Sequence, residues 1–380
     1  DQGGIRRRSH GLTGPLPHSH RSPMSLKKNY DGYSSFSYLE AGADYKAFDL
    51  ADELERVPPF RLPLSDEDEA RCTSLIERCL FVSMHEHLGV FPERIEETPE
   101  YVRHGRMATA FEGLAASHWD AVFDNLMDGI CTIHSRSGWQ WDDVLHDLDR
   151  IDILHGFGLR SLGITSSESN ALGNGLKEDR DGGLTKFGRK AVERMNKVGL
   201  LIDCSHCGDQ TTLDTVEWSE KPIVLSHIGA RELWLSNRLA PDDVMEAVAA
   251  KGGVIGIECA PHTTLTKNNR RHNLEAFMEH FEYVRSLVGI EHVGFGPDTV
   301  YGDHVGLHHT YLSNLSIKDS RGGHHPDQHF EEVEYVEGLE NPTEGSINLV
   351  RWLVKAGYAD GDIERVMGGN ALRVMAEAWA

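Results

Sequence analysis

Cysteine is scarce in this sequence, with 6 residues in a chain of 380. They are Cys72, Cys79, Cys131, Cys204, Cys207 and Cys259. Their spacing is neither dense nor regular, which argues against a small secreted domain held together by disulfides. We therefore expect the protein to work in a reducing compartment and to be cytoplasmic.

Long hydrophobic runs are missing as well. No stretch of the sequence approaches the roughly 18 to 20 consecutive apolar residues that a membrane-spanning helix needs. The basic residues Arg6, Arg7 and Arg8 are followed by Gly, Pro and His, and not by the apolar segment of a secretory signal. We expect no membrane partner.

Positive charge is in the minority. The chain has 38 Lys and Arg against 60 Asp and Glu, so its formal net charge is −22. Nucleic acids and anionic membranes would repel such a protein, and neither is expected as a partner. Apolar residues make up 39% of the chain, enough for a sizeable core, and the 22 histidines suggest a metal site or proton transfer.

The pattern divides the chain into an N-terminal arm and one α/β region. Residues 1–23 are rich in Gly, Pro, Ser, His and Arg, so we expect them to be disordered or non-native, with Met24 as the natural start. An irregular arm extends over residues 1–57. Over residues 58–380, short apolar runs alternate with longer amphipathic stretches, as in βα units around a parallel sheet. Seven or eight such units predict a (β/α)8 barrel of the TIM type.

Seven segments are candidate strands of this barrel. They are Leu80–Met84, Gly129–His134, Gly158–Thr165, Gly199–Ser205, Pro222–Ser226, Gly252–Ile257 and His292–Gly296. Residues 299–330, rich in Gly, His, Asp and Ser, interrupt the alternation and are too long for an ordinary connection. Because they start at a strand end, we expect an inserted lid that sets substrate choice. A solvated insertion without a role is the alternative.

Metal-ligand residue types recur at the C-terminal ends of the candidate strands. Leu80–Met84 leads into His85 and His87, and residues two apart on a strand point to the same face. Three further strands lead into His206, His227 and Asp298. Strand ends converge on one face of a barrel, so these groups predict a shared site suited to zinc. A lone histidine of this kind is more often structural, but four with an aspartate favour a metal.

Cys204 and Cys207 flank His206 in a CxxC pattern. This pattern also occurs in redox and zinc sites, but no second cysteine pair completes a structural zinc site. We expect Cys204 to pack beneath the predicted site.

Six motifs between Gly156 and the C-terminus form a specific set when taken together. They are Gly183-Leu184-Thr185, Ile202-Asp203-Cys204-Ser205-His206, Leu225-Ser226-His227, Pro241-Asp242-Asp243, Gly294-Phe295-Gly296-Pro297-Asp298 and Gly368-Gly369-Asn370-Ala371-Leu372-Arg373-Val374. This set resembles the membrane (renal) dipeptidase family of the amidohydrolase superfamily. The resemblance implies a distorted (β/α)8 barrel, zinc at the strand C-termini, hydrolysis of dipeptides or related amides, and a homo-oligomer.

The resemblance also implies roles for individual residues. His85, His206 and His227 match metal-binding histidines of the family, and Asp298 matches the carboxylate that binds metal and moves the proton. Arg238 matches an arginine that grips the substrate carboxylate. An ordinary exposed arginine is the alternative interpretation of Arg238.

The chain departs from the family pattern at three places. His87 stands where the family has Asp, the stretch His134–Asp142 lacks the family's bridging Glu, and Ser166 replaces a substrate-binding His. The remaining set is similar to that of one-metal members, such as adenosine deaminase and the metal-dependent decarboxylases. We therefore expect one zinc ion (Zn2+) per chain, with two possible.

The predicted zinc ligands are His85, His87, His206 and Asp298, with His227 as a fifth ligand or a hydrogen-bond donor. Such an ion lowers the pKa of its water to about 7 and so supplies hydroxide at neutral pH. Asp298 would accept the proton, and His227 would stabilise the oxyanion.

Three interpretations of the reaction remain open. The leading one is attack by metal-bound hydroxide on a C–N bond of a small carboxylate-bearing substrate held by Arg238. The alternative is cleavage of a C–C bond, by hydrolysis or decarboxylation, in an aromatic or dicarbonyl acid. Trp139 and Gln140 would then contact the substrate, although barrel packing is an equal explanation. A binding protein without turnover is disfavoured, because Asp298 would be a needless buried charge.

Overall fold

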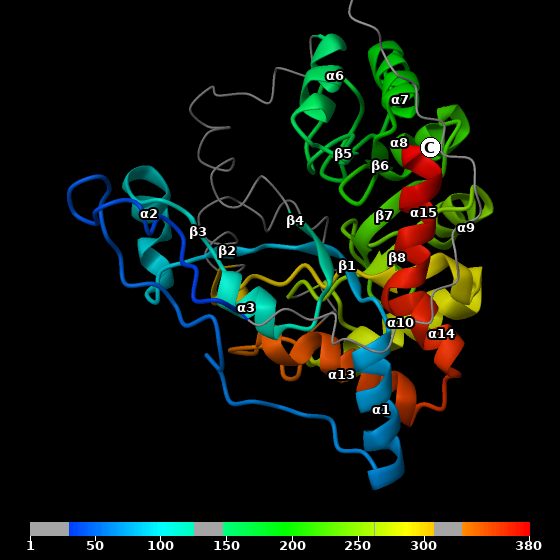
Figure 1. Cartoon of the computed structure of the whole chain (residues 1–380). Helices are drawn as coiled ribbons and strands as arrows, with labels where there is room; N and C mark the ends of the chain where they lie inside the picture. Colours follow the sequence, from blue (N-terminus) through cyan, green and yellow to red (C-terminus); the bar gives the residue numbers. More distant parts are fainter. Residues whose placement is uncertain (1–29, 125–146, 262, 308–328) are drawn as a thin grey trace, which may run out of the picture.

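The computed structural model describes residues 30–124, 147–261, 263–307 and 329–380. Parallel strands run through the middle of the molecule, and helices α7 to α10 are stacked along one side of them (Figure 1). In these ranges no helix combines the length and the apolar character of a membrane span.

Five of the strands form a continuous parallel sheet in the order β5-β6-β7-β8-β9. They are β5 (Ser161–Gly163), β6 (Leu201–Asp203), β7 (Ile223–Ile228), β8 (Val254–Ile257) and β9 (Val293–Phe295). Two further strands, β1 (Val82–Glu86) and β4 (Ala121–Asp124), pair in parallel with each other.

Backbone hydrogen bonds join β1 to the chain that leaves β9. The N–H of Asp298 donates to His85 O at 3.0 Å, and the N–H of His87 donates to Thr299 O at 2.9 Å. The order β4-β1-β9-β8-β7-β6-β5 is that of a (β/α)8 barrel, and the fold prediction is confirmed. The predicted strand Gly129–His134 lies outside the described residues, in the chain between β4 and β5.

The other six candidate strands correspond to β1 and to β5 through β9, with ends displaced by a few residues. Strand β4 was not predicted, because its four residues are half-buried or exposed and lack a clear apolar pattern. The short antiparallel pair β2 (Gly89–Val90) and β3 (Ala108–Thr109) was also missed.

Helices follow the strands and form the outer layer. Helix α7 (Lys186–Val198) begins after Thr185, whose hydroxyl accepts from Gly188 N–H at 2.9 Å, and ends at Gly199 with φ 79°. The other helical segments are α1 (Asp66–Arg78), η1 (Ile95–Glu97), α2 (Thr98–His104), α3 (Phe111–Ala116), α6 (Asp149–Gly156), α8 (Asp209–Trp218), α9 (Asp242–Ala250), α10 (Leu274–Val288), η2 (Ile290–His292), α13 (Pro342–Lys355), α14 (Asp360–Glu364), the π-helical η3 (Arg365–Gly369) and α15 (Asn370–Trp379).

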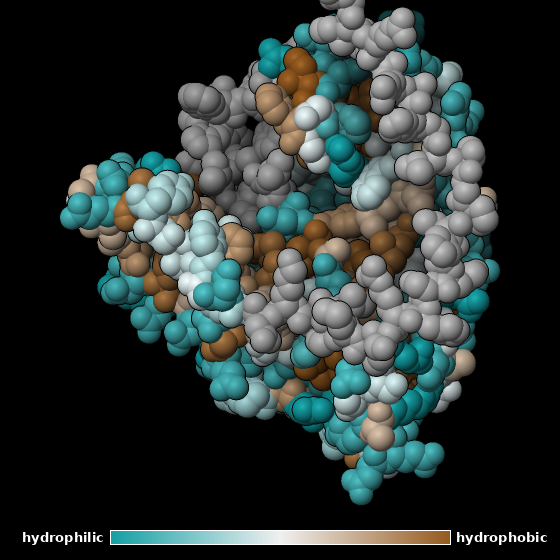
Figure 2. Space-filling view, viewed as in Figure 1, coloured by the Kyte–Doolittle hydropathy of each residue, from teal (hydrophilic) through white to brown (hydrophobic). Residues whose placement is uncertain are grey.

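Helix α15 packs against the beginnings of the strands. Its residues Val374 and Met375 belong to one buried cluster with the first residues of three strands, Val82, Leu201 and Val254. The opposite, C-terminal ends of the strands are therefore left for polar side chains. In the orientation of Figure 1, the surface is hollowed over β1 and β4 (Figure 2).

The predicted lid begins inside the protein. Val300, Tyr301, His304 and Leu307 are all buried. The first two and Leu307 pack against the chain that follows β1, at Leu88, Val90 and Phe91, and Nε2 of His304 donates to Cys259 O. A surface loop can therefore begin only after residue 307. Residues 308–328 lie outside the described part, so the lid stays a prediction for them.

Candidate metal centre

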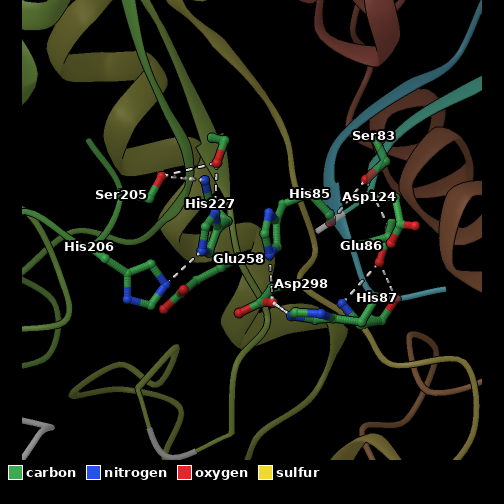
Figure 3. A network of polar contacts seen from close by, with 12 residues as sticks. Ser83, His85, Glu86, His87, Asp124, Ser205, His206, His227, Glu258 and Asp298 are labelled. Atoms are coloured by element: carbon green, nitrogen blue, oxygen red, sulfur yellow. Dashed lines mark hydrogen bonds and ion pairs between the residues drawn. The ribbon is translucent and has the colours of Figure 1, made fainter. Parts of the chain in front are cut away.

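The ends of β1 and β9 bring three potential metal ligands together. Nε2 of His87 lies 3.0 Å from Oδ1 of Asp298, and Nε2 of His85 lies 3.4 Å from the same oxygen. One ligand atom from each residue falls within 4.8 Å of the other two. His85 and Asp298 are buried, whereas His87 is 23% exposed, so solvent reaches the group at His87. Figure 3 shows both rings pointing toward the Asp298 carboxylate.

His206 and His227 form a second group beside the first. Their Nε2 atoms are 3.0 Å apart. The ring of His227 stacks on that of His85 at a centroid distance of 3.6 Å and an angle of 15°. Among the described residues, the predicted ligands therefore form a group of three and a neighbouring pair, not one shell of five.

Hydrogen bonds orient the two histidines of the pair. Ser167 Oγ lies 2.9 Å from Nδ1 of His206, and Ser226 Oγ lies 2.7 Å from Nδ1 of His227. Ser226 in turn donates to Asp203 Oδ2 at the end of β6. One proton assignment satisfies this chain, with Ser167 donating to His206 and the Nε2–H of His206 donating to His227. The proton on Nε2 of His206 then lies between the two rings. It must move away from this position, to Nδ1 of His206 or to solvent, before both Nε2 atoms can ligate a cation.

Asp298 has an unusual backbone conformation, with φ 60°. The next residue, Thr299, is held by Glu86, which accepts from its N–H at 2.9 Å and from its hydroxyl. Ser83 Oγ donates to the other oxygen of Glu86 at 2.9 Å. Burial raises the pKa of Glu86 to about 8, although these hydrogen bonds oppose the shift. Strand β1 thus presents His85 and His87 to one side and holds the Asp298 turn through Glu86.

The protonation states suit a divalent cation. Burial lowers the pKa of His85 to about 4 and holds the pKa values of His206 and His227 well below their usual range. Burial raises the pKa of Asp298, but the hydrogen bond from His87 and the nearby histidines outweigh it, so the pKa lies well below normal. Neutral imidazoles beside an ionised carboxylate are the forms that bind metal, and this donor set fits zinc.

Arg238 and Glu258 lie next to these groups. Arg238 makes an ion pair through Nη2 with Oε2 of Glu258, and the same nitrogen is 3.9 Å from Oδ2 of Asp298. Glu258 directly follows β8 and is fully buried. The structure therefore places Arg238 beside the candidate metal ligands, where the sequence had suggested it. Its ion pair with Glu258 was not predicted.

Other predicted residues lie elsewhere. Ser166 is exposed in the loop after β5, and its neighbour Ser167 makes the contact with His206. Trp139 and Gln140 lie outside the described residues. Cys204 and Cys207 are buried free thiols in the main hydrophobic core, and the position of Cys204 beneath the site stays a prediction.

Sequence reasoning missed Glu258, Glu86 and Ser167. Glu258 could have been found, because it follows a candidate strand in the same way as His206 and His227. Glu86 was passed over since it points away from its histidine neighbours on β1. Ser167 has φ 73°, a backbone turn that no sequence pattern indicated.

Comparisons with known proteins show the family to which the chain is related. A family model described as membrane dipeptidase, peptidase family M19, matches residues 115–314. "Dipeptidase 3" of Rattus norvegicus is 28% identical over 192 residues, 50% of this chain and 33% of the relative. Dipeptidase tcpJ of Claviceps purpurea is 25% identical over 227 residues, 59% of this chain and 46% of the relative. The match thus spans a third to a half of these relatives' length.

Two solved structures share the fold. An amidohydrolase from Pseudomonas aeruginosa has a TM-score of 0.62 and 20% identity, and the match covers 81% of this chain and 99% of that one. The probable dipeptidase PvdM from the same organism has a TM-score of 0.56 and 17% identity, over 83% and 99% of the two chains.

Proposed function

Because the chain belongs to the membrane dipeptidase family, peptidase family M19, we propose that it is a metal-dependent hydrolase that cleaves a C–N bond of a small, dipeptide-like substrate. The observation that carries this proposal is the group of His85, His87 and Asp298 at adjoining strand ends. Two imidazole nitrogens and a carboxylate oxygen are typical ligands of a catalytic zinc site, which keeps a position open for water or substrate.

The cation would be held by His85, His87 and Asp298, with His206 and His227 beside it. When bound, a divalent ion supplies Lewis acidity and lowers the pKa of a water molecule to about 7. Zinc fits this donor set best, and one ion per chain is part of the proposal.

The protein's own groups would move the proton. Asp298 stays ionised, so its carboxylate is able to accept a proton from a nucleophilic water and to return it to the leaving amine. His227 is buried and held at Nδ1 by Ser226. To donate to the oxygen on which negative charge develops, its ring would have to carry the proton on Nε2, the reverse of the tautomer assigned above, and we propose that this shift accompanies substrate binding.

The alternative, cleavage of a C–C bond in an aromatic or dicarbonyl acid, stays a prediction. Its support from Trp139 and Gln140 falls on residues that the structure does not describe. The homo-oligomer and the cytoplasmic location are also predictions.

A dipeptide panel tests the proposal. Protein stripped with a chelator and reloaded with zinc should hydrolyse dipeptides, and the stripped protein should not. His87→Ala should abolish turnover, while the matched control His104→Ala, at an exposed histidine of α2, should not. If zinc-loaded wild type cleaves no dipeptide but converts aromatic acids, the C–C reaction replaces this proposal.

A further inference from the structure

Arg238 lies beside the candidate metal ligands, yet its charge is already paired. Its side chain is 9% exposed, and that of its partner Glu258 is fully buried. Nη1 of Arg238 donates to Ser205 O at 3.1 Å, and Nη2 donates to His227 O at 3.1 Å in addition to the ion pair with Glu258. The guanidinium is thus held between the ends of β6, β7 and β8.

We propose that Glu258 is a specificity-determining residue. By neutralising Arg238, it removes the attraction for a substrate carboxylate, so the site accepts small amides whose group beside Arg238 carries no charge at least as readily as dipeptides. This inference rests on the proposed hydrolysis and assigns its substrate class.

The balance of charge supports this assignment. The carboxylate of Glu258 already pairs with the one guanidinium of Arg238, whereas the carboxylate of Asp298, 3.9 Å away, would be engaged by the proposed cation. A substrate carboxylate would have to displace Glu258 or approach an arginine whose charge is already balanced. Displacement would leave Glu258 as a buried anion without its cation, which is strongly unfavourable. An uncharged amide makes no such demand.

Glu258 is also fixed in place, so it cannot easily turn away. Its N–H donates to Ile228 O at 3.0 Å, and Thr263 Oγ1 donates to its Oε1 at 3.1 Å. Figure 3 shows the Glu258 side chain directed into the space between His206 and Asp298.

The test compares kcat/KM for Ala-Ala with kcat/KM for its C-terminal amide, using the zinc-loaded protein and following peptide-bond cleavage by chromatography. Wild type should show a ratio no greater than about 3. Glu258→Gln frees the charge of Arg238 and should raise the ratio about tenfold or more, mainly through a lower KM for Ala-Ala. Adding Arg238→Met to Glu258→Gln should return the ratio to the wild-type value.

Glu69→Gln is the matched control, since Glu69 pairs with buried Arg351 on another side of the barrel; its ratio should equal that of wild type. The inference would be overturned if wild type preferred Ala-Ala over the amide by more than about 10-fold and Arg238→Met lost this preference. This outcome does not depend on whether Glu258→Gln folds. An unchanged ratio in folded, zinc-containing Glu258→Gln would also overturn it. If wild type cleaves neither substrate, the proposed hydrolysis falls and this inference with it.

Discussion

Asp298 pays a conformational cost to reach its position. A φ of 60° in a residue other than glycine costs on the order of 1 kcal/mol or more. Such strain persists only where neighbouring contacts determine the conformation, and here Glu86 holds the following residue, Thr299, by two hydrogen bonds. Glu86 therefore acts as a positioning residue for Asp298.

Removing the Glu86 side chain should loosen this turn. We expect Glu86→Ala to weaken metal binding and activity by about 10- to 100-fold, the usual effect of losing a group that orients a ligand. Glu86→Gln should keep most of both, because its oxygen can accept from Thr299 while its amide donates to Ser83. Zinc titration and kcat measure the effect. Equal losses in the Ala and Gln variants would contradict the positioning role.

A simple rule applied to the sequence identified most residues of the candidate metal centre. His85, His87, His206 and Asp298 were found because polar residues at strand ends meet on one barrel face. The rule does not say which of them share a cation, since that depends on side-chain directions. It also does not foresee the Glu258 partner of Arg238, because ion pairs across strands are fixed by packing.

At the scale of elements, glycine allows the strand ends to approach closely. A Cβ on Gly296, just after β9, would lie 2.0 Å from Ser226 O and 3.1 Å from His85 N. Both contacts are with backbone atoms, which cannot swing aside. The ends of β1, β7 and β9 can therefore meet at the metal centre only with glycine at this position.

Gly296→Ala should destabilise the protein by about 1–3 kcal/mol, and more if the strands cannot separate, and it should reduce zinc affinity. Urea unfolding and zinc titration measure the two effects. Gly361→Ala is the control, since nothing lies within 4 Å of a Cβ there, and its stability should change little. Wild-type stability and zinc affinity in Gly296→Ala would show that the strand ends have more room than the structure indicates.

Helix α13 holds the chain that enters the barrel. Its polar side chains hydrogen-bond to the backbone of residues 57–62, including Phe60 N–H to Glu344 Oε2 at 2.8 Å and Leu62 N–H to Asn348 Oδ1 at 3.0 Å. Burial raises the pKa of Glu344 to about 7. The sequence alone could not indicate that the polar face of α13 binds this part of the chain.

This shift makes stability depend on pH. The folded state holds the Glu344 proton more tightly than the unfolded state does. The stabilisation of the folded state by protonated Glu344 is therefore fully present below about pH 4.5. It is lost as the pH rises to about 7. Glu344→Gln keeps an acceptor for Phe60 and should gain roughly 1–2 kcal/mol over wild type between pH 5 and pH 8, allowing for partial solvent screening. Urea unfolding at both pH values measures it, with exposed Glu67→Gln as control. An equal difference from wild type at pH 5 and pH 8 would refute the account.

At the scale of the whole molecule, the barrel follows from the alternation of βα units, and six of the seven candidate strands are found in the described residues. The periodic segments were predictable because burial on both faces gives strands a continuous apolar run. The structures of the arm, of β4 and of the start of the segment after Asp298 were harder to predict, because contacts with distant parts of the chain determine them. Val300 and Tyr301 are buried by partners that are distant in the sequence.

The central claim is that His85, His87 and Asp298 hold a catalytic cation, and the metal content of purified protein tests it most directly. Mass spectrometry of wild type, His206→Ala and His87→Ala should find about one equivalent of zinc or another divalent transition ion in the first two and almost none in the third. His206→Ala should keep its ion because His206 lies outside the group of three. Wild type without metal, or His87→Ala with a full equivalent, would contradict the account.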